Sequence, residues 1–430
     1  MKRRSSPVMS DDCPTMKFER VDQIVQWRLC LGCGACAAIC ENAAISLMDI
    51  EDQGIRPVVN HSRCRMCGQC VGVCPGIEIS HGAFNGETIG ELRQSWGPVL
   101  EVWEGYASDS EIRFKGSSGG VATALSLFCL ENGVAQAVLQ TRDKPGAPLE
   151  NEPVLSKNKD DLIASTGSRY SPAAPCERLD MIRESDCRFV VVGKPCDIVG
   201  LHKARAAKEE LDKNLALAIS IFCAGTPAKL GTKRILETLG VEPGRVEQIR
   251  YRGLGWPGMT SVRTKDKPDC VAEMTYSQSW GDILSKHVQF RCRLCPDSTG
   301  EFADISCGDP WYRQIDPGEP GRSLVVVRTE RGREILRKAG EAGYVTLEAA
   351  NPKVLVSSQQ ALLKRRRHLW GRLLAMRIAR IPAPRLIGFS LFANWKDLPL
   401  IEKVRSIGGT FKRIAQRRLR RPLEAPSATD

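Results

Sequence analysis

Two cysteine runs near the amino end constrain this chain more than any other feature. The first is Cys30-x-x-Cys33-x-x-Cys36-x-x-x-Cys40, and the second is Cys64-x-x-Cys67-x-x-Cys70-x-x-x-Cys74-Pro75. Three thiolates spaced in this way wrap one face of an iron–sulfur cube, and the fourth, one helical turn further on, reaches the other cube. The spacing therefore predicts two 4Fe–4S clusters. We expect cluster one to be held by Cys30, Cys33, Cys36 and Cys74, and cluster two by Cys64, Cys67, Cys70 and Cys40.

A structural zinc site is the alternative for clustered cysteines. Zinc knuckles pair two C-x-x-C units and have no use for a third and fourth cysteine in each run. The first run ends in Cys40-Glu41 where the second has Cys-Pro, which leaves the ligand count unchanged. We expect Gly32, Gly34 and Gly68 to relieve crowding where the backbone passes close to a cube.

Length, cysteine content and charge bound the class of protein. The chain has 430 residues and 18 cysteines, which is room for two or three domains. No apolar run follows the first charged residues, and no stretch reaches the ~18 apolar residues of a membrane span. We therefore expect a cytoplasmic protein whose cysteines hold metal rather than disulfides. The net charge of +12 is uneven, because residues 361–421 hold 17 Lys and Arg against Asp397 and Glu402.

Beyond about residue 101 the pattern alternates between helices and strands. It predicts strands at 134–140, 188–193, 215–223, 246–252 and 324–328, and helices at 121–131, 198–210, 226–240 and 331–342. Such alternation predicts an α/β body with a mixed or parallel sheet and flanking helices, preceded by a small α+β ferredoxin domain. The expected division is a flexible leader (1–22), the ferredoxin domain (23–80), a linker (81–100), two parts of the body (101–185 and 186–345) and a basic C-terminal extension (346–430).

Four further cysteines suggest a third site. Cys196 and Cys223 follow or end predicted strands, and Cys292 and Cys295 form a C-x-x-C unit. The ends of neighbouring parallel strands meet at one edge of a sheet, so these thiols would close a tetrathiolate site there. Spacing alone supports buried core thiols equally well, and Cys307 competes for the fourth position. The remaining cysteines, Cys13, Cys129, Cys176, Cys187 and Cys270, are expected to be free, structural or incidental.

A set of ordered motifs then extends over about residues 100–330. They are Phe114-Lys115-Gly116-Ser117-Ser118-Gly119-Gly120, Gly167-Ser168-Arg169-Tyr170, Gly193-Lys194-Pro195-Cys196, Phe222-Cys223-Ala224-Gly225-Thr226-Pro227, Tyr251-Arg252-Gly253-Leu254-Gly255-Trp256-Pro257-Gly258, and Cys292-x-x-Cys295-Pro296-Asp297 with Ala303-Asp304-Ile305 and Gly308-Asp309. With these motifs the sequence resembles the family of beta subunits of coenzyme F420 (8-hydroxy-5-deazaflavin) hydrogenases and dehydrogenases, which includes 7-hydroxymethyl chlorophyll a reductase.

The resemblance implies FAD and a 4Fe–4S cluster beside it. It favours Cys196, Cys223, Cys292 and Cys295 over Cys307 as the ligands of a third cluster. One departure is Gly-Lys-Pro-Cys-Asp at residues 193–197, where the family often has Gly-Thr-Pro-Cys-Gln. That change concerns the substrate or the electron partner rather than the cluster ligand.

Two glycine-rich loops are candidates for cofactor contacts. The loop Gly116, Ser117, Ser118, Gly119 and Gly120 precedes a predicted helix, whose first amides suit a phosphate or a flavin edge. The residues alone favour an ordinary turn, and the resemblance assigns this loop to FAD. The second candidate for contact with the flavin is the loop with Ser168, Arg169 and Tyr170, where Arg169 offers a fixed cation to an anionic group.

A third glycine pattern has the letters of a dinucleotide fingerprint. It is Gly253-x-Gly255-x-x-Gly258, but Pro257 lies inside it and the sequence from Thr260 predicts a strand where the fingerprint needs a helix. We expect a loop over flavin or substrate instead, with Trp256 as a stacking surface, or else a plain surface turn.

These features predict an FAD- and 4Fe–4S-dependent oxidoreductase that moves electrons between its clusters and an organic substrate. The alternative is an electron-transfer subunit of a larger hydrogenase or dehydrogenase. Expected partners are an external one-electron carrier such as ferredoxin and a small organic molecule, with a homo-oligomer left open. No catalytic acid is singled out, because His287, Tyr170 and Asp309 are equally open to structural roles.

The basic extension allows three interpretations. Lys364 to Arg367 precede Leu369, Trp370, Leu373, Leu374 and Met376, a mixture that suits a helix on an anionic membrane surface. A solvated basic face that packs on the body through its apolar side is equally supported. Non-specific nucleic-acid binding is the third, and no specific nucleic acid is expected.

Overall fold

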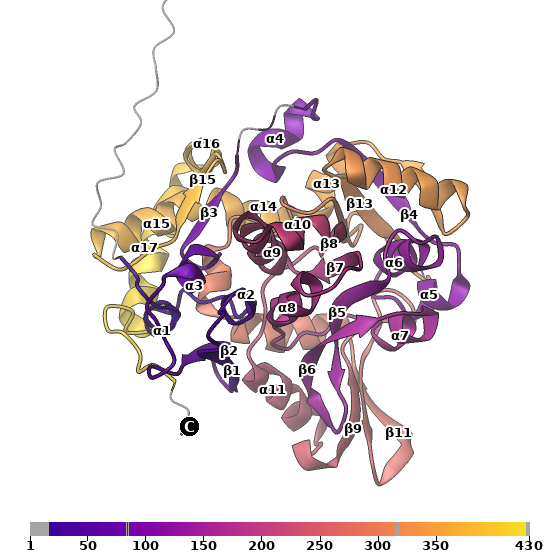
Figure 1. Cartoon of the computed structure of the whole chain (residues 1–430), viewed down its shortest axis with the longest axis horizontal. Coiled ribbons are helices and arrows are strands. Elements are labelled where there is room, and N and C mark those ends of the chain that lie inside the picture. Colours follow the sequence, from indigo (N-terminus) through magenta and orange to yellow (C-terminus); the bar gives the residue numbers. More distant parts are fainter. Residues whose placement is uncertain (1–16, 83, 85, 315, 317, 427–430) are drawn as a thin grey trace, which may run out of the picture.

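An eight-stranded mixed sheet forms the centre of the molecule (Figure 1). The computed structural model describes residues 17–426 except 83, 85, 315 and 317, and only the backbone of 268–270. The strand order is β14-β4-β13-β12-β8-β7-β5-β6. Four neighbours are parallel, namely β5 (Ala137–Lys144), β7 (Phe189–Gly193), β8 (Leu215–Ile221) and β12 (Ile305–Gly308). Antiparallel strands flank them, namely β13 (Ser323–Val327), β4 (Glu101–Ala107) and β14 (Val345–Ala349) on one side and β6 (Ala147–Ser156) on the other. The prediction of an α/β body with a mixed sheet is confirmed.

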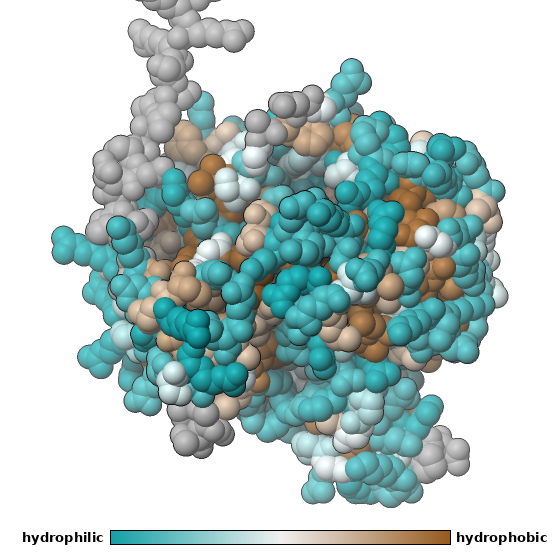
Figure 2. Space-filling view, in the orientation of Figure 1, coloured by the Kyte–Doolittle hydropathy of each residue, from teal (hydrophilic) through white to brown (hydrophobic). Residues whose placement is uncertain are grey.

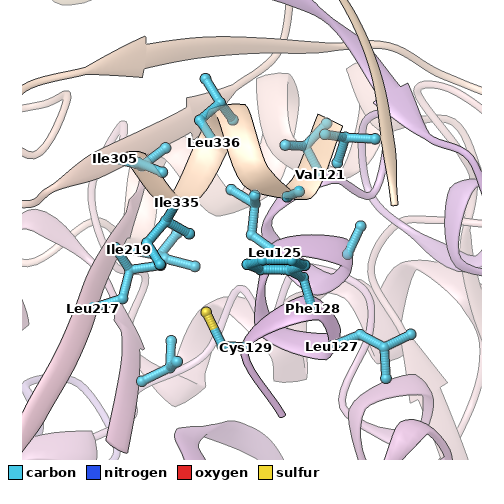
Figure 3. Close-up of a cluster of buried hydrophobic side chains, with 14 of the residues drawn as sticks. Val121, Leu125, Leu127, Phe128, Cys129, Leu217, Ile219, Ile305, Ile335 and Leu336 are labelled. Carbon is cyan, nitrogen blue, oxygen red and sulfur yellow. The ribbon is translucent and has the colours of Figure 1, made fainter. Parts of the chain in front are cut away.

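Helices cover both faces of this sheet because successive strand residues point to opposite sides. Val190 of β7 packs in a cluster with α6 (Val121–Glu131) and α12 (Glu330–Glu341). Its neighbour Val191 packs on the opposite face with α8 (Leu179–Arg183) and α9 (Pro195–Ala207). Figure 3 shows the first cluster, in which Leu125 and Phe128 of α6 lie over the parallel strands. Cys129 points into the same cluster and is fully buried, so it is a core residue.

The remaining elements of the body surround the sheet. Its other helices are α5 (Ser110–Lys115), α7 (Lys159–Ala164), α10 (Glu209–Lys213), α11 (Lys229–Leu239) and α13 (Lys353–Ser358). A separate three-stranded antiparallel sheet contains β9 (Val246–Arg250), β10 (Thr260–Thr264) and β11 (Lys267–Met274). Short turns of other helix types lie at Pro175–Arg178, Pro243–Arg245, Ser277–Ile283, Leu284–His287 and Phe290–Leu294.

Most predicted elements are present, with two differences of consequence. The helix expected at 226–240 begins only at Lys229, because Pro227 forms a bridge with Val288 instead of starting the helix. The strand expected at 246–252 lies in the small sheet rather than in the central one. The rejection of the dinucleotide fingerprint is confirmed, since strand β10 follows that loop.

The ferredoxin module contains α1 (Val21–Gln26), α2 (Ala35–Ala38), the hairpin β1 (Ile45–Ile50) and β2 (Gly54–Val59), and α3 (Gln69–Gly72). It docks on the face of the body that carries α9. Ala35 and Ile39 of the module share one buried cluster with Ile198 and Leu201 of α9. Apolar packing therefore fixes the module against the helix that carries Cys196 in its first turn.

The expected linker has structure of its own. Helix α4 (Gly90–Trp96) buries Leu92 and Trp96, which are one turn apart, against Leu324 and Val326 of the sheet. Most of the predicted leader and all of Cys13 lie outside the described residues, as does the side chain of Cys270.

The basic extension is folded onto the molecule. Its helices are α14 (Gln360–Arg367), α15 (Leu369–Ile378), α16 (Leu391–Lys396) and α17 (Leu400–Gln416), and its strand β15 (Arg385–Ile387) pairs in parallel with β3 (Glu78–Ser80). Figure 1 shows α15 and α17 beside the ferredoxin module. Leu369, Leu373 and Met376 are buried in a cluster with Leu294, so this segment packs on the body through its apolar side.

The surface is mostly hydrophilic on the face that Figure 2 presents, where apolar residues form separate small areas. Such scattered apolar residues are normal on a folded protein. None of the described helices combines the length and apolarity that crossing a membrane requires.

Candidate cluster sites and the adjoining cavity

The ferredoxin module brings its eight cysteines together in two sets of four. A small cavity of about 20 Å³ is lined by Cys30, Cys33, Cys36 and Cys74. A second cavity of about 20 Å³ is lined by Cys64, Cys67, Cys70 and Cys40. These are the two crossed groups that the spacing predicts, with the last cysteine of each run beside the first three of the other. Within the described residues, no three His, Cys, Asp or Glu side chains could hold a single metal ion.

The thiols of these sets fit a positively charged inorganic centre. Burial, together with the neighbouring thiolates of Cys30 and Cys33, raises the pKa of Cys74 to about 12. Such groups become thiolates when a metal supplies the compensating charge. Backbone amides are already aimed at the sulfurs, since Gly32 N donates to Cys30 Sγ and Gly76 N donates to Cys74 Sγ, each at 3.3 Å.

The expected reason for the module's glycines is only partly correct. A Cβ on Gly34 would lie 2.7 Å from Glu177 N, so crowding does apply there, although the neighbour is the body. At Gly68 no heavy atom lies within 4 Å of that position. Gly68 has a φ of +74° at the start of α3, which is the left-handed conformation that glycine adopts without strain.

Cys196, Cys223, Cys292 and Cys295 also converge. Cys196 lies in the first turn of α9 after β7, Cys223 follows β8, and the C-x-x-C unit lies at the turn Phe290–Leu294. After burial, the thiolates of Cys292 and Cys223 contribute to the raised pKa of Cys295, which is about 12. Amides again face sulfurs, because Gly225 N donates to Cys223 Sγ at 3.3 Å and Thr226 N to Cys292 Sγ at 3.5 Å.

The rival residue Cys307 stands apart from this third set. Burial alone raises the pKa of Cys307 to about 12, without a contribution from another thiol. Its position on β12 places it at the wall of a larger cavity. Cys176, expected to be incidental, is fully buried beside Cys33, since its amide donates to Cys33 O at 3.0 Å and its thiol to Asp197 O at 3.1 Å.

The larger cavity has a volume of about 270 Å³ and lies at the carboxyl edge of the parallel strands. Its wall includes Gln140 and Thr141 of β5, Gly193 at the end of β7, Ile221 at the end of β8 with Cys223 beyond it, and Gly308 at the end of β12 with Asp309 beyond it. Open α/β sheets place their ligands at this edge. Because Cys223 belongs to the third thiol set, that set directly adjoins the cavity.

The predicted cofactor loop lines this cavity with one exception. Gly116, Ser117, Ser118 and Gly120 line it, together with Val121, Ala122 and Thr123 at the start of α6. Gly119 does not, because it packs against the sheet, where its amide donates to Ser323 Oγ at 2.9 Å. A Cβ on Gly119 would lie 2.6 Å from Gly105 O. An eleven-residue helix therefore presents its amino end to the cavity, which favours a negatively charged ligand group.

The second predicted loop also reaches the cavity through Ser168, Arg169 and Tyr170. The guanidinium of Arg169, however, is used to hold the loop in place. It donates to Asn151 Oδ1, Ile249 O and Pro148 O at 2.8–2.9 Å. Arg169 thus links the loop to β6 and β9. Three of its five N–H donors are used in these contacts rather than for an anionic ligand.

A buried ion pair that the sequence did not single out lies across the cavity. Arg252 donates to both carboxylate oxygens of Asp309, at 2.9 and 2.7 Å, and is 2% exposed. Trp256 Nε1 donates to the same carboxylate at 2.8 Å. In the sequence the two residues belong to separate motifs, Tyr-Arg-Gly and Gly-Asp. Their spacing does not indicate that they are in contact.

Aromatic rings form a wall beside this pair. Trp311 stacks on Tyr276 with ring centroids 5.2 Å apart, and on Trp256 with centroids 5.4 Å apart. Trp256, expected as a stacking surface, therefore does stack, although on protein rings. Tyr276, Trp280 and Trp311 line the cavity.

The three candidate proton donors separate in the structure. Tyr170 and Asp309 line the cavity, whereas His287 is not among its lining residues. A further buried pair, Lys194 and Asp197, also lines it, with Lys194 Nζ 2.7 Å from Asp197 Oδ2. These are the two positions at which the sequence departs from the common family motif.

A two-cluster ferredoxin module docked on an α/β body, with a third thiol set beside a carboxyl-edge cavity, defines an iron–sulfur oxidoreductase chain. Residues 102–179 and 186–353 match the models for the N-terminal and C-terminal parts of the coenzyme F420 hydrogenase/dehydrogenase beta subunit. Residues 29–76 match the 4Fe–4S dicluster domain. The chain belongs to the family of coenzyme F420 hydrogenase/dehydrogenase beta subunits and carries a 4Fe–4S dicluster domain.

Its relatives belong to several oxidoreductases. The F420-dependent formate dehydrogenase 1 subunit beta of Methanococcus maripaludis is 29% identical over 59% of this chain and 63% of its own length. The coenzyme F420 hydrogenase subunit beta of Methanothermobacter thermautotrophicus is 27% identical over 57% of this chain and 83% of its own. The coenzyme F420-dependent sulfite reductase of Methanocaldococcus jannaschii is 24% identical over 74% of this chain and 47% of its own.

A solved structure has a similar fold. It is a chain of the xenon-derivatised F420-reducing [NiFe] hydrogenase complex from Methanosarcina barkeri. The TM-score is 0.51 at 20% identity, over 77% of this chain and 98% of that one. At this identity the likeness concerns the fold alone.

Proposed function

We propose that this chain is the electron-transfer subunit of a coenzyme F420-dependent oxidoreductase, exchanging electrons between its clusters and a flavin-type ring at the carboxyl-edge cavity. One observation carries the proposal, namely that Cys223 belongs to the third thiol set and also lines the cavity. The names of the relatives favour a subunit of a larger complex over the enzyme acting alone that we expected from the sequence.

The ligand sets are part of this proposal. Cluster one takes Cys30, Cys33, Cys36 and Cys74; cluster two takes Cys64, Cys67, Cys70 and Cys40; a third cluster takes Cys196, Cys223, Cys292 and Cys295. Cluster two would exchange electrons with an external one-electron carrier, because Cys67 is exposed and next to exposed Met66. The order from surface to cavity is then cluster two, cluster one and the third cluster.

The cavity suits the planar ring of a cofactor, and the rest of an FAD molecule would extend beyond it. Its volume of about 270 Å³ lies near the lower end of the ~300–1,000 Å³ of small-ligand pockets. A bound flavin would supply the change between one-electron and two-electron chemistry, and a deazaflavin would exchange a hydride with it. Tyr276 and Trp311 would contact the ring, and the amino end of α6 would hold an anionic part of its side chain.

FAD and coenzyme F420 are the two rings to distinguish. We propose FAD as the resident cofactor and coenzyme F420 as the exchange partner, on the grounds of the glycine-serine loop at α6 and the names of the relatives. Asp309 and Tyr170 are the residues placed to hold or move a proton at the cavity wall.

Anaerobic purification tests this function directly. The chain should contain roughly twelve iron atoms and twelve acid-labile sulfides, as three cubes require, together with about one FAD per chain. It should then catalyse oxidation of reduced coenzyme F420 by a viologen dye. Iron without flavin, together with dye reduction by reduced coenzyme F420 in the absence of FAD, would remove FAD from the proposal. A preparation with no iron would contradict the function as a whole.

We also propose peripheral contact between the extension and an anionic membrane surface. The residues buried in α15 are not part of this proposed contact. Phe392, Leu400, Ile401 and Val404 on α16 and α17 are 54–77% exposed, and exposed Lys396 lies among them. Exposed apolar residues beside cations suit the interface of an anionic bilayer.

A liposome pelleting assay tests this contact. Leu400→Glu/Ile401→Glu should abolish salt-sensitive pelleting with anionic vesicles, whereas Arg337→Glu on the distant α12 should not. Truncation at residue 361 is unsuitable, because the extension supplies β15 and buried core residues. Equal pelleting of wild type and the double variant would exclude the contact.

A further inference from the structure

Arg291 is a fully buried cation to which the proposed function gives no role. It precedes the C-x-x-C unit and is 1% exposed. Its guanidinium donates to three neutral carbonyl oxygens, Gly76 O at 2.8 Å, Leu294 O at 2.8 Å and Pro75 O at 3.3 Å. Across the described residues no carboxylate forms an ion pair with it.

Burying a charge is unfavourable unless an opposite charge compensates it. Carbonyl oxygens satisfy the N–H groups of Arg291 but carry no net charge. The opposite charges around it are thiolates, in the order Cys295, Cys292, Cys74 and Cys196, and they counteract the lowering of its pKa by burial. Three of these belong to the third set and Cys74 belongs to cluster one.

The backbone contacts show that Arg291 bridges the two sets. Pro75 and Gly76 directly follow Cys74, the last ligand of cluster one, while Leu294 lies between Cys292 and Cys295. One guanidinium thus holds the exit of the ferredoxin run to the C-x-x-C turn. None of the four cysteines of cluster two is among its electrostatic neighbours.

Helix α9 shows independently that the two sets are close. Its first turn carries Cys196 of the third set, and Gly200 lies one turn, about 6 Å, further along from Cys196. A Cβ added at Gly200 would lie 3.3 Å from Cys33 Sγ and 3.4 Å from Ala35 Cβ. The helix that carries a ligand of the third set therefore touches a ligand of cluster one.

We propose that Arg291 is the shared counter-charge of cluster one and the third cluster, which keeps the reduction potentials of both higher than their burial alone would allow. This rests on the proposed function, since it requires both clusters. A cube held by four thiolates is anionic, and reduction adds one more negative charge, so a fixed cation favours the reduced form. The transfer that it serves moves one electron from one cube to the other, with no bond made or broken.

The test uses the full chain, purified without oxygen, with redox titrations monitored by EPR. The variants are Arg291→Gln, which removes the charge, Arg291→Lys, which keeps it, and Arg293→Gln as the matched control. Arg293 lies in the same turn, but its charged neighbours are Arg417, Arg365 and Arg413 of the extension and Cys292 of the third set, with no ligand of cluster one among them. Iron and sulfide are counted first, because a wild type with fewer than three clusters contradicts the proposed function rather than the role of Arg291.

In Arg291→Gln, two of the three midpoints should fall and the third, that of cluster two, should stay. The expected fall is at least tenfold in the equilibrium constant for reduction, which is about 59 mV for a one-electron couple. Arg291→Lys should keep all three midpoints, and Arg293→Gln should leave cluster one unchanged. Three unchanged midpoints in Arg291→Gln, or an equal fall in all three, would overturn the proposal.

Arg291→Lys also covers the case in which Arg291→Gln does not assemble its clusters. A full iron content and wild-type midpoints in Arg291→Lys would then support the counter-charge, since charge is what the two side chains share. Loss of iron in both variants would overturn it, because the guanidinium would then act as a structural tie through its three carbonyl contacts.

Discussion

At the scale of single residues, we infer that some of the buried cysteines are cluster ligands and that others are not. Cys223 follows β8, Cys307 lies on the neighbouring parallel strand β12, and both line the cavity, yet only Cys223 has other thiols beside it. Replacing Cys223 with Ser should remove about four iron atoms per chain, the content of one cube. Cys307→Ser should keep the wild-type iron content. Equal iron in both variants would show that the third set is not a ligand set.

The buried ion pair of Arg252 and Asp309 leads to a prediction about the free energy of unfolding. Removing one partner of a buried pair leaves the other uncompensated, at a cost of about 3–5 kcal/mol. Asp309→Asn should therefore lower the free energy of unfolding by nearly that amount, because Arg252 is almost inaccessible to water. The exposed pair of Lys144 and Glu150 is the control, where Lys144→Met should change stability by less than about 1 kcal/mol. Urea unfolding of both variants is the measurement, and equal effects would contradict the account.

At the scale of elements, a buried cluster of charges joins three segments that are far apart in sequence. Glu301 pairs with Arg366 of α14 and with His81, whose Nε2 lies 2.8 Å from Glu301 Oε2. The extension, the exit of the ferredoxin module and the body thus meet at one carboxylate. Although burial raises the pKa of Glu301, Arg366 and His81 hold it at about 2, below its ordinary value of 4.5.

The lowered pKa gives this contact a defined pH dependence. A carboxyl whose folded pKa is depressed adds stability above its unfolded pKa, and this stability is lost as the pH falls towards the folded pKa. Glu301→Gln should therefore be less stable than wild type by about 3 kcal/mol at pH 7. The difference should shrink from pH 4.5 towards pH 2. Urea midpoints of the two proteins across that range would show it, and a difference independent of pH would contradict it.

The elements also show what the sequence could predict. The helix at 121–131 and the strands around 189–193 and 215–221 followed from apolar runs with clear ends, since such runs depend only on local burial. The pairing of β15 with β3 and the site of β9 did not, because strand partners are chosen by tertiary contacts that no local pattern records. For the same reason the two thiol sets of the ferredoxin module were predictable from spacing, and the third set needed the family resemblance. Arg252 with Asp309 and Arg291 with Cys74 were not predictable.

At the scale of the whole molecule, the parts form one route. The ferredoxin module carries two thiol sets, α9 links it to the third, and Cys223 links the third to the cavity. Gly200→Ala tests the docking that this route needs. Its methyl group would press on Cys33 Sγ and Ala35 Cβ, so we expect a lower melting temperature and faster proteolysis between residues 81 and 89. Gly244→Ala, where no atom lies within 4 Å, is the control and should change neither.

The proposed function requires electrons to pass between the cavity and the clusters. An EPR spectrum of the anaerobic, FAD-loaded chain, recorded after adding reduced coenzyme F420, tests this most directly. The account predicts the signals of reduced 4Fe–4S clusters, matching those that dithionite produces, and predicts their loss in Cys223→Ser for clusters one and two as well as the third. A silent spectrum with reduced coenzyme F420, in a sample whose clusters dithionite does reduce, would contradict it.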